Sequence, residues 1–107
     1  MARRRRLTIA RGAARDLSDA RRWLTQPGAG ARAGLRLASL SAAVQDPRRH
    51  PCRWSAGEHP GTRERPVEGY RIIYEVAPDT GDDATAGDVT VLRVRGPGQD
   101  SPDLQSP

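Results

Sequence analysis

The sequence contains no phenylalanine and no lysine, and it has only one cysteine and one methionine. Without phenylalanine, the core must be built from leucine, valine, isoleucine and alanine, together with two tryptophans and two tyrosines. The single Cys52 cannot form an internal disulfide, which suits a reducing compartment. No apolar run approaches the roughly 20 residues of a membrane span, and the arginine-rich start precedes a segment too short and too charged for an export signal. These absences predict a soluble, cytoplasmic chain.

The charge of the chain is unevenly distributed, and all 18 basic side chains are arginines. Residues 1–77 hold 16 arginines against 7 acidic residues, a net charge of +9. Residues 78–107 hold 2 arginines against 6 acidic residues, a net charge of −4. A cationic body of this kind attracts phosphate or an acidic protein. The distribution therefore favours a polyanion or an acidic protein as partner over an ordinary solvated surface.

Two helices are predicted after a short first strand around residues 6–10. Apolar side chains recur at helical spacing over residues 13–25 and again over residues 31–44. A Pro-Gly turn ends the first helix and Asp46-Pro47 ends the second, because proline cannot continue a helix. The two helices form a hairpin whose apolar stripes need a sheet to cover them. Trp23 lies beside the first stripe, so we expect it to be half-buried.

Three strands follow an irregular segment. A charged strand over residues 61–67 is joined by a tight turn to a second strand over residues 70–76, and the third strand covers residues 88–96. Alternation gives a small antiparallel sheet with one apolar face, formed on the second strand by Tyr70, Ile72, Tyr74 and Val76. The acidic loop before the third strand is expected to be mobile.

The chain length predicts one domain with a modest core that needs no metal support. We expect residues 1–6 to form a basic flexible arm, residues 7–96 to form the single domain, and residues 97–107 to be a disordered tail.

The arginines of the predicted strands are the principal candidates for a binding face, namely Arg63, Arg65, Arg71, Arg93 and Arg95. If Leu92 and Val94 face the helices, alternation turns Arg93 and Arg95 outward, and the same logic turns Arg71 outward. Guanidiniums converging on one sheet face would repel one another unless an anion or an acidic partner neutralised them. The alternative is that some of them extend into solvent or pair with nearby glutamates.

Other chemistry-bearing side chains give weaker signals. The spacing of His50, Cys52, Glu58 and His59 matches no familiar metal site, and nothing nearby in the sequence lowers the pKa of the Cys52 thiol. Neither a metal site nor a catalytic residue is therefore predicted from them. Trp54, which follows Arg53, is equally compatible with packing and with stacking on a base or a partner chain.

Several segments of the chain resemble, in order, the ParE/RelE superfamily of bacterial toxins. The most specific is Gly69-Tyr70-Arg71-Ile72-Ile73-Tyr74-Glu75-Val76, and the others are Ala14-Arg15-Asp16-Leu17, Asp46-Pro47, Gly61-Thr62-Arg63-Glu64 and Val91-Leu92-Arg93-Val94 before Gly96. The resemblance covers residues 7–99 and implies an α+β fold of order β-α-α-β-β-β, with a helical hairpin packed on a small curved antiparallel sheet. It also implies a toxin that forms a hetero-oligomer with a neutralising antitoxin.

The two branches of the superfamily imply different mechanisms. RelE-like toxins cleave ribosome-bound mRNA through clustered basic residues, a role that would fall here on Arg63, Arg71, Arg93 and Arg95. ParE-like toxins poison DNA gyrase without that cluster. RNA cleavage needs a proton acceptor and a proton donor, but no Arg, His or Tyr follows Gly96, and arginine stays protonated.

The resemblance therefore favours a non-enzymatic ParE-like toxin that acts on DNA gyrase and needs no cofactor. Its antitoxin or target would bind the five arginines and Trp54. A ribosome-dependent mRNA interferase is the alternative function, and a small basic nucleic-acid-binding module is the third.

Overall fold

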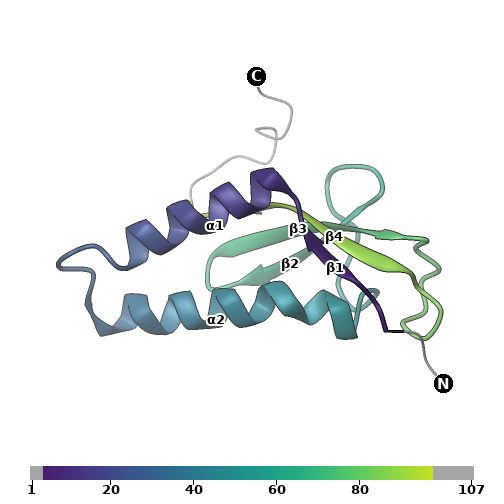
Figure 1. Cartoon of the computed structure of the whole chain (residues 1–107), viewed down its shortest axis with the longest axis horizontal. Coiled ribbons are helices and arrows are strands. Elements are labelled where there is room, and N and C mark those ends of the chain that lie inside the picture. The colour runs from purple at the N-terminus through teal and green to yellow at the C-terminus, as the bar shows by residue number, and fades with distance from the viewer. Residues whose placement is uncertain (1–3, 98–107) are drawn as a thin grey trace.

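Two helices and four strands follow one another across residues 4–97, the part of the chain that this computed structural model describes. They are β1 (Leu7–Ile9), α1 (Arg11–Leu24), α2 (Gly30–Arg49), β2 (Thr62–Val67), β3 (Tyr70–Ala77) and β4 (Asp88–Arg95). The helices form a hairpin packed on the sheet (Figure 1). The predicted α+β fold of order β-α-α-β-β-β is confirmed.

The sheet has the order β1-β4-β3-β2. β2, β3 and β4 are antiparallel as predicted, but β1 runs parallel to β4, so the sheet is mixed. Glu68 and Gly69 join β2 to β3 with φ angles of 50° and 82°. Positive φ at both positions is typical of the tight turn whose twist matches that of the flanking strands. The turn predicted at Glu68-Gly69 is confirmed.

The core lies between the helical hairpin and one face of the sheet. Tyr70, Ile72, Tyr74 and Val76 of β3 are all buried there, as alternation predicted. They pack with valines of β4 and with apolar residues of both helices, among which Leu24 and Leu40 are the largest buried members. Ile73 faces the other way, yet its exposed fraction is 0%. The face opposite the helices is therefore partly covered too.

An irregularity in β4 changes which of its side chains face the helices. Ile73 pairs with Arg93 and Tyr74 pairs with Val91, so Leu92 is an extra residue on β4. Such a β-bulge resets the alternation of the strand. Val91 and Val94 are therefore the buried residues. The prediction that Leu92 and Val94 both face the helices was wrong at Leu92.

Helix α2 is longer than predicted, because Asp46-Pro47 does not end it and the helix continues to Arg49. Pro47 occupies the last turn, where its missing N–H costs a single hydrogen bond. Its ring is almost completely buried. Burial of the ring offsets the lost bond, and the helix ends only where the His50 backbone N–H donates to the Asp46 carbonyl.

The N-terminal segment is attached at Arg5. Its guanidinium donates to the carbonyls of Gly87, Arg48, Asp83 and Ala86 at 2.6–3.0 Å. Arg5 differs from the flexible arm expected over residues 1–6, because these bonds join it to the end of α2 and to the acidic loop between β3 and β4. Residues 1–3 and the expected tail beyond Pro97 lie outside the described residues. Across residues 4–97, neither helix combines the length and the apolar character that a membrane span requires.

Candidate interaction surface

The five candidate arginines do not converge on one face of the sheet. On β2, Arg63 pairs with Tyr74 and Arg65 pairs with Ile72, so both arginines share the face that packs on the helices. Arg71 and Arg95 are opposite one another across β3 and β4, on the face away from the helices. The prediction of a single five-arginine face was wrong. The register of β2 and β3 places Arg63 and Arg65 on the face toward the helices and Arg71 on the opposite face.

Arg63 is bound within the protein by side-chain and backbone oxygens. Its guanidinium donates to both carboxylate oxygens of Asp79, at 2.8 and 3.0 Å, and to the carbonyls of Cys52 and Trp54, at 3.3 and 2.6 Å. These hydrogen bonds hold the pKa of Asp79 below its ordinary value. Arg63 thereby joins β2 to the segment after α2 and to the acidic loop, which is a structural role.

Among the described residues, the thiol and the phenol hydroxyl nearest Arg63 both have a raised pKa. Burial, followed by the nearby Asp79 charge, raises the pKa of the Cys52 thiol, which therefore stays protonated. Burial also raises the pKa of Tyr74, whose hydroxyl donates to the Pro51 carbonyl at 2.7 Å. His50 lies 3.4 Å from a carboxylate oxygen of Asp83. Within residues 4–97, no three His, Cys, Asp or Glu side chains are grouped as a metal site would require.

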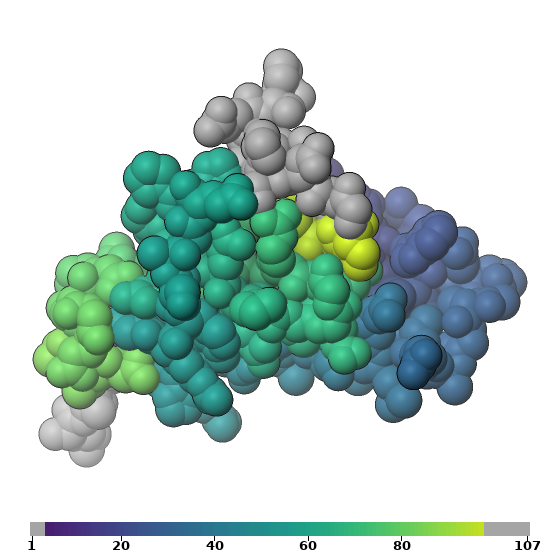
Figure 2. All heavy atoms as spheres, turned by 180° about the vertical axis from the view of Figure 1, so that it is seen from behind, coloured from purple at the N-terminus to yellow at the C-terminus, as the bar shows by residue number. Residues whose placement is uncertain are grey.

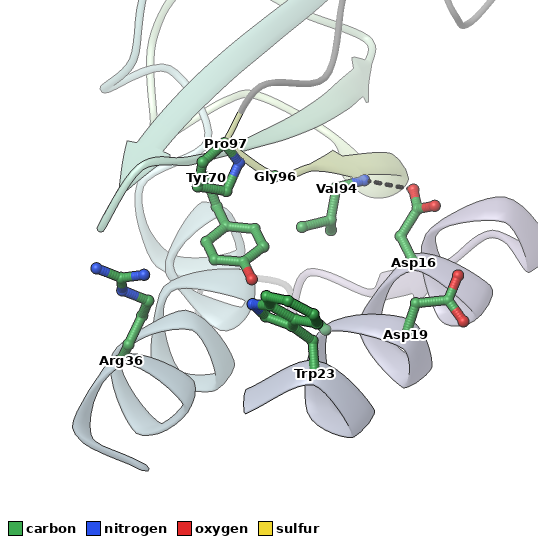
Figure 3. A pocket seen from close by; sticks show the side chains of 9 residues that line it. Asp16, Asp19, Trp23, Arg36, Tyr70, Val94, Gly96 and Pro97 are labelled. Carbon is green, nitrogen blue, oxygen red and sulfur yellow. Dashed lines mark hydrogen bonds between the residues drawn. The ribbon is translucent and has the colours of Figure 1, made fainter. Parts of the chain in front are cut away.

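Arg93 is bound to helix α1 rather than directed outward. Its Nε and Nη2 donate to the two carboxylate oxygens of Asp16 at 2.8 and 3.2 Å. The Val94 backbone N–H donates to the same carboxylate at 2.8 Å, as Figure 3 shows. β1 pairs with β4 only as far as Val91, so Asp16 caps the edge of β4 beyond β1. The outward orientation predicted for Arg93 was wrong for its guanidinium. Although Arg93 pairs with Ile73, the side chain turns to Asp16 at the edge of β4 that β1 leaves uncovered.

Gly12 allows this contact. A Cβ atom at Gly12 would lie 2.9 Å from Cδ of Arg93, which is closer than such atoms approach. The absence of a side chain at the start of α1 therefore leaves the space through which Arg93 reaches Asp16.

A cavity of about 450 Å³ lies beside Asp16, between the helical hairpin and the ends of β3 and β4. In Figure 3, the ring of Trp23 and the hydroxyl of Tyr70 point toward one another across it, with Arg36 on the α2 side. Trp23 is 65% exposed. The expectation that it is half-buried was wrong, because the neighbouring apolar stripe ends in Ala20 and Leu24, which fill the core without it.

A second cavity, of about 360 Å³, brings Trp54 and Arg71 together. The segment before β2, β2 itself and β3 all contribute to its lining, which consists of Arg53, Trp54, Ser55, Ala56, Glu64, Pro66 and Arg71. We call this cavity the Trp54 pocket. Figure 2 shows the molecule from behind, where the segment between α2 and β2, in teal, lies beside the green strands β2 and β3.

The indole of Trp54 is stacked with two guanidiniums. The Arg65 guanidinium carbon lies 4.9 Å from the ring centroid and that of Arg53 lies 5.4 Å from it. Arg65 also donates to Asp46 of α2 at 2.9 Å, which keeps it on the helix side of β2. Arg53 was not among the predicted site residues. Its position next to Trp54 in the sequence was a signal, but only the fold shows that it lines the same pocket as Arg71.

The contact of Arg71 with Glu64 is longer than the contacts of Arg63 and Arg93 with their aspartates. Its Nη1 lies 3.7 Å from a carboxylate oxygen of Glu64, whose other oxygen accepts the Glu58 backbone N–H at 3.0 Å. Its cross-strand neighbour Arg95 is only 4% exposed. Of the six predicted site residues, Trp54 and Arg71 therefore line the pocket and Arg95 lies next to it, whereas the other three bind aspartates.

Comparisons with known proteins agree with this fold. A sequence profile described as the ParE toxin of the type II toxin–antitoxin system parDE matches residues 7–100. Among solved structures, the chain is similar to one titled "Chromosomal ParDE TA system from P. aeruginosa", with a TM-score of 0.63 and 17% sequence identity. That likeness covers 88% of this chain and 97% of the other chain. No curated protein sequence matches the chain.

Proposed function

Because the chain belongs to the family of ParE toxins of type II toxin–antitoxin systems, we propose that it arrests bacterial growth by acting on DNA gyrase and is neutralised by a cognate antitoxin. The family match spans every helix and strand of the fold. On this proposal the toxin acts in the bacterial cytoplasm by binding, without a cofactor and without a catalytic residue of its own.

The observation that supports binding over RNA cleavage is the separation of the arginines. Of the four that a nuclease would use, Arg63 and Arg93 are bound to Asp79 and Asp16, which leaves Arg71 and Arg95 on the face away from the helices. Cleavage also needs a group that accepts the proton of the 2′-hydroxyl. Arginine stays protonated, and the buried Tyr74 hydroxyl is directed to a carbonyl inside the protein.

The alternative function, a ribosome-dependent mRNA interferase, is supported by the Arg71–Arg95 pair. Two guanidiniums opposite one another on neighbouring strands are suited to binding a phosphate group. A small nucleic-acid-binding module without toxicity is supported only by the net charge of +5.

We propose that the antitoxin or the target binds the sheet face that carries Trp54, Arg71 and Arg95. Arg71 and Trp54 would make direct contact, and the buried Arg95 would support Arg71 from the next strand. Arg63, Arg65 and Arg93 would contribute to binding by holding the segments that shape this face.

Growth measurements test the toxin assignment. Induced expression in a bacterial host should arrest growth, and co-expression of the antitoxin encoded by the adjacent reading frame should relieve the arrest. Unimpaired growth of cells that contain soluble, folded protein would contradict the proposal.

The two mechanisms are separated by assays on the purified protein. It should inhibit supercoiling by DNA gyrase or trap cleaved DNA, and it should leave mRNA on translating ribosomes intact. Cuts in ribosome-bound mRNA that disappear in Arg71→Ala would instead support the interferase.

A further inference from the structure

We infer that the Trp54 pocket is a carboxylate-binding subsite, which holds one acidic side chain of an antitoxin segment that crosses the sheet face away from the helices. The inference rests on the proposed function, because it names the chemistry by which the antitoxin would recognise this surface. It has two parts, namely the charge of the occupant and the direction from which the occupant approaches.

The charge of the pocket lining favours a carboxylate. Arg53 and Arg71 line the pocket from two separate elements, the segment before β2 and strand β3. Glu64 is the one carboxylate in the lining among the residues that the structure describes. It already accepts the Glu58 backbone N–H at 3.0 Å. The lining therefore carries two positive charges against one negative charge, and guanidiniums are the side chains that best bind carboxylates in a fixed geometry.

The Arg71–Glu64 contact is suited to exchange of partners. Its 3.7 Å separation is longer than the 2.8 Å contacts that Arg63 makes with Asp79 and Arg93 makes with Asp16. A charge-assisted hydrogen bond has a length of about 2.7–2.9 Å. An incoming carboxylate can thus form a shorter contact with Arg71 than Glu64 does, while Glu64 keeps its backbone donor.

The stacking of two guanidiniums on the Trp54 ring favours an acidic peptide over a nucleic acid as the occupant. Single-stranded nucleic acids bind aromatic side chains by stacking bases on the ring. Here the ring is already stacked with Arg65 and Arg53, so a base would have to displace a guanidinium. The pocket of about 360 Å³ is at the small end of ligand-binding cavities, which fits a single side chain.

The edge of the sheet at β2 is closed to an added strand, so the antitoxin segment must cross the face. The Gly57 backbone N–H donates to the Thr62 carbonyl at 2.8 Å, and the Glu64 backbone N–H donates to the Ser55 carbonyl at 3.1 Å. Further along the same edge, Pro66 has no N–H to offer. The protein's own segment therefore occupies the position that a peptide would take in strand addition.

The subsite can be tested by following the indole N–H resonances of Trp23 and Trp54 in the full-length protein, assigned with Trp23→Phe. The probes are a short glutamate-rich peptide, its glutamine counterpart of equal length, and a single-stranded RNA oligonucleotide, all at one ionic strength. We expect a saturable shift of the Trp54 resonance with the glutamate peptide and none with the glutamine peptide. Arg53→Ala and Arg71→Ala should each weaken binding about tenfold or more.

Arg32→Ala is the matched control, because Arg32 is an exposed arginine of α2 outside the pocket, and it should bind as the unchanged protein does. An equal loss in Arg32→Ala, or equal binding of the glutamine peptide, would overturn the subsite. A tighter response to RNA that depends on Arg71 would replace the peptide with a nucleic acid. Growth arrest is measured separately: arrest without a Trp54 response rejects the subsite alone, and a response without arrest rejects the toxin assignment alone.

Discussion

The arginines of this small domain fall into two groups with different surroundings. Arg63, Arg65 and Arg93 each have an aspartate at 2.8–2.9 Å, and each aspartate comes from another part of the fold. Arg53 and Arg71 surround the Trp54 pocket, and Arg71 has its carboxylate at 3.7 Å. The first group joins helices and loops to the sheet, whereas the second lines the pocket that we propose binds a partner.

Composition alone does not assign a role to an arginine. Arg93 and Arg95 are two residues apart on β4, yet Arg93 binds helix α1 and Arg95 is buried beside Arg71. They have the same register parity, and the position of Asp16 on α1 separates them.

The largest effect is expected at Asp16, which accepts two hydrogen bonds from Arg93 and one from the Val94 backbone. Asp16→Ala leaves a partly buried guanidinium and a strand N–H without their acceptor, so it should lower the free energy of unfolding by about 3 kcal/mol. Chemical denaturation checks this value. Asp19→Ala is the matched control on the same helix, since Asp19 is exposed and lies 3.5 Å from Arg22. A loss at Asp19 as large as that at Asp16 would contradict the proposed cap.

Arg63→Ala is expected to have the next largest effect. It removes both bonds to Asp79 and leaves the carbonyls of Cys52 and Trp54 without their donor. The loss should be about 2 kcal/mol, which corresponds to roughly 8–16 °C in melting temperature for a domain of this size. Calorimetry provides the measurement. An unchanged melting temperature would show that the acidic loop does not need Arg63.

A smaller effect should appear as a pH dependence of stability. Because the pKa of Asp79 is lower in the folded state than its ordinary value of 3.8, the unfolded chain binds a proton more readily. The pair with Arg63 therefore stabilises the fold above about pH 4, and this contribution is lost as the pH falls toward the lowered pKa. The difference in unfolding free energy between the unchanged protein and Asp79→Asn should shrink by at most about 1 kcal/mol on acidification. A difference that grows on acidification would refute the assigned direction.

Most of the fold followed from the sequence, because it depends on local periodicity. The helical stripe that includes Ala13 and Leu24, the alternation of β3 and the Glu68-Gly69 turn are each set by a few neighbouring residues, and all were predicted. The extension of α2 through Pro47 was missed, because burial of the ring in the folded protein outweighs the local cost of proline. The parallel pairing of β1 with β4 likewise depends on contacts far apart in the sequence.

The interaction surface was predicted less completely. It depends on the pairing register of the strands and on aspartates that are far away in the sequence. The uncovered edge of β4 lets Arg93 reach Asp16 of α1 although its register places it opposite Ile73, and the register of β2 places Arg63 and Arg65 on the helix face. No local pattern identifies Asp16, Asp46 and Asp79 as the residues that bind these arginines. Trp54 and Arg71 were singled out from the sequence, but their shared pocket with Arg53 required the fold.

The division of the arginines is tested most directly by measuring the unfolding free energies of Arg63→Ala and Arg71→Ala side by side. Both residues lie on adjacent strands of the same sheet, and both have a carboxylate nearby. We predict a loss of about 2 kcal/mol for Arg63→Ala and of no more than about 0.5 kcal/mol for Arg71→Ala. Equal losses, or a larger loss for Arg71→Ala, would contradict the assignment of Arg63 to the fold and of Arg71 to the partner.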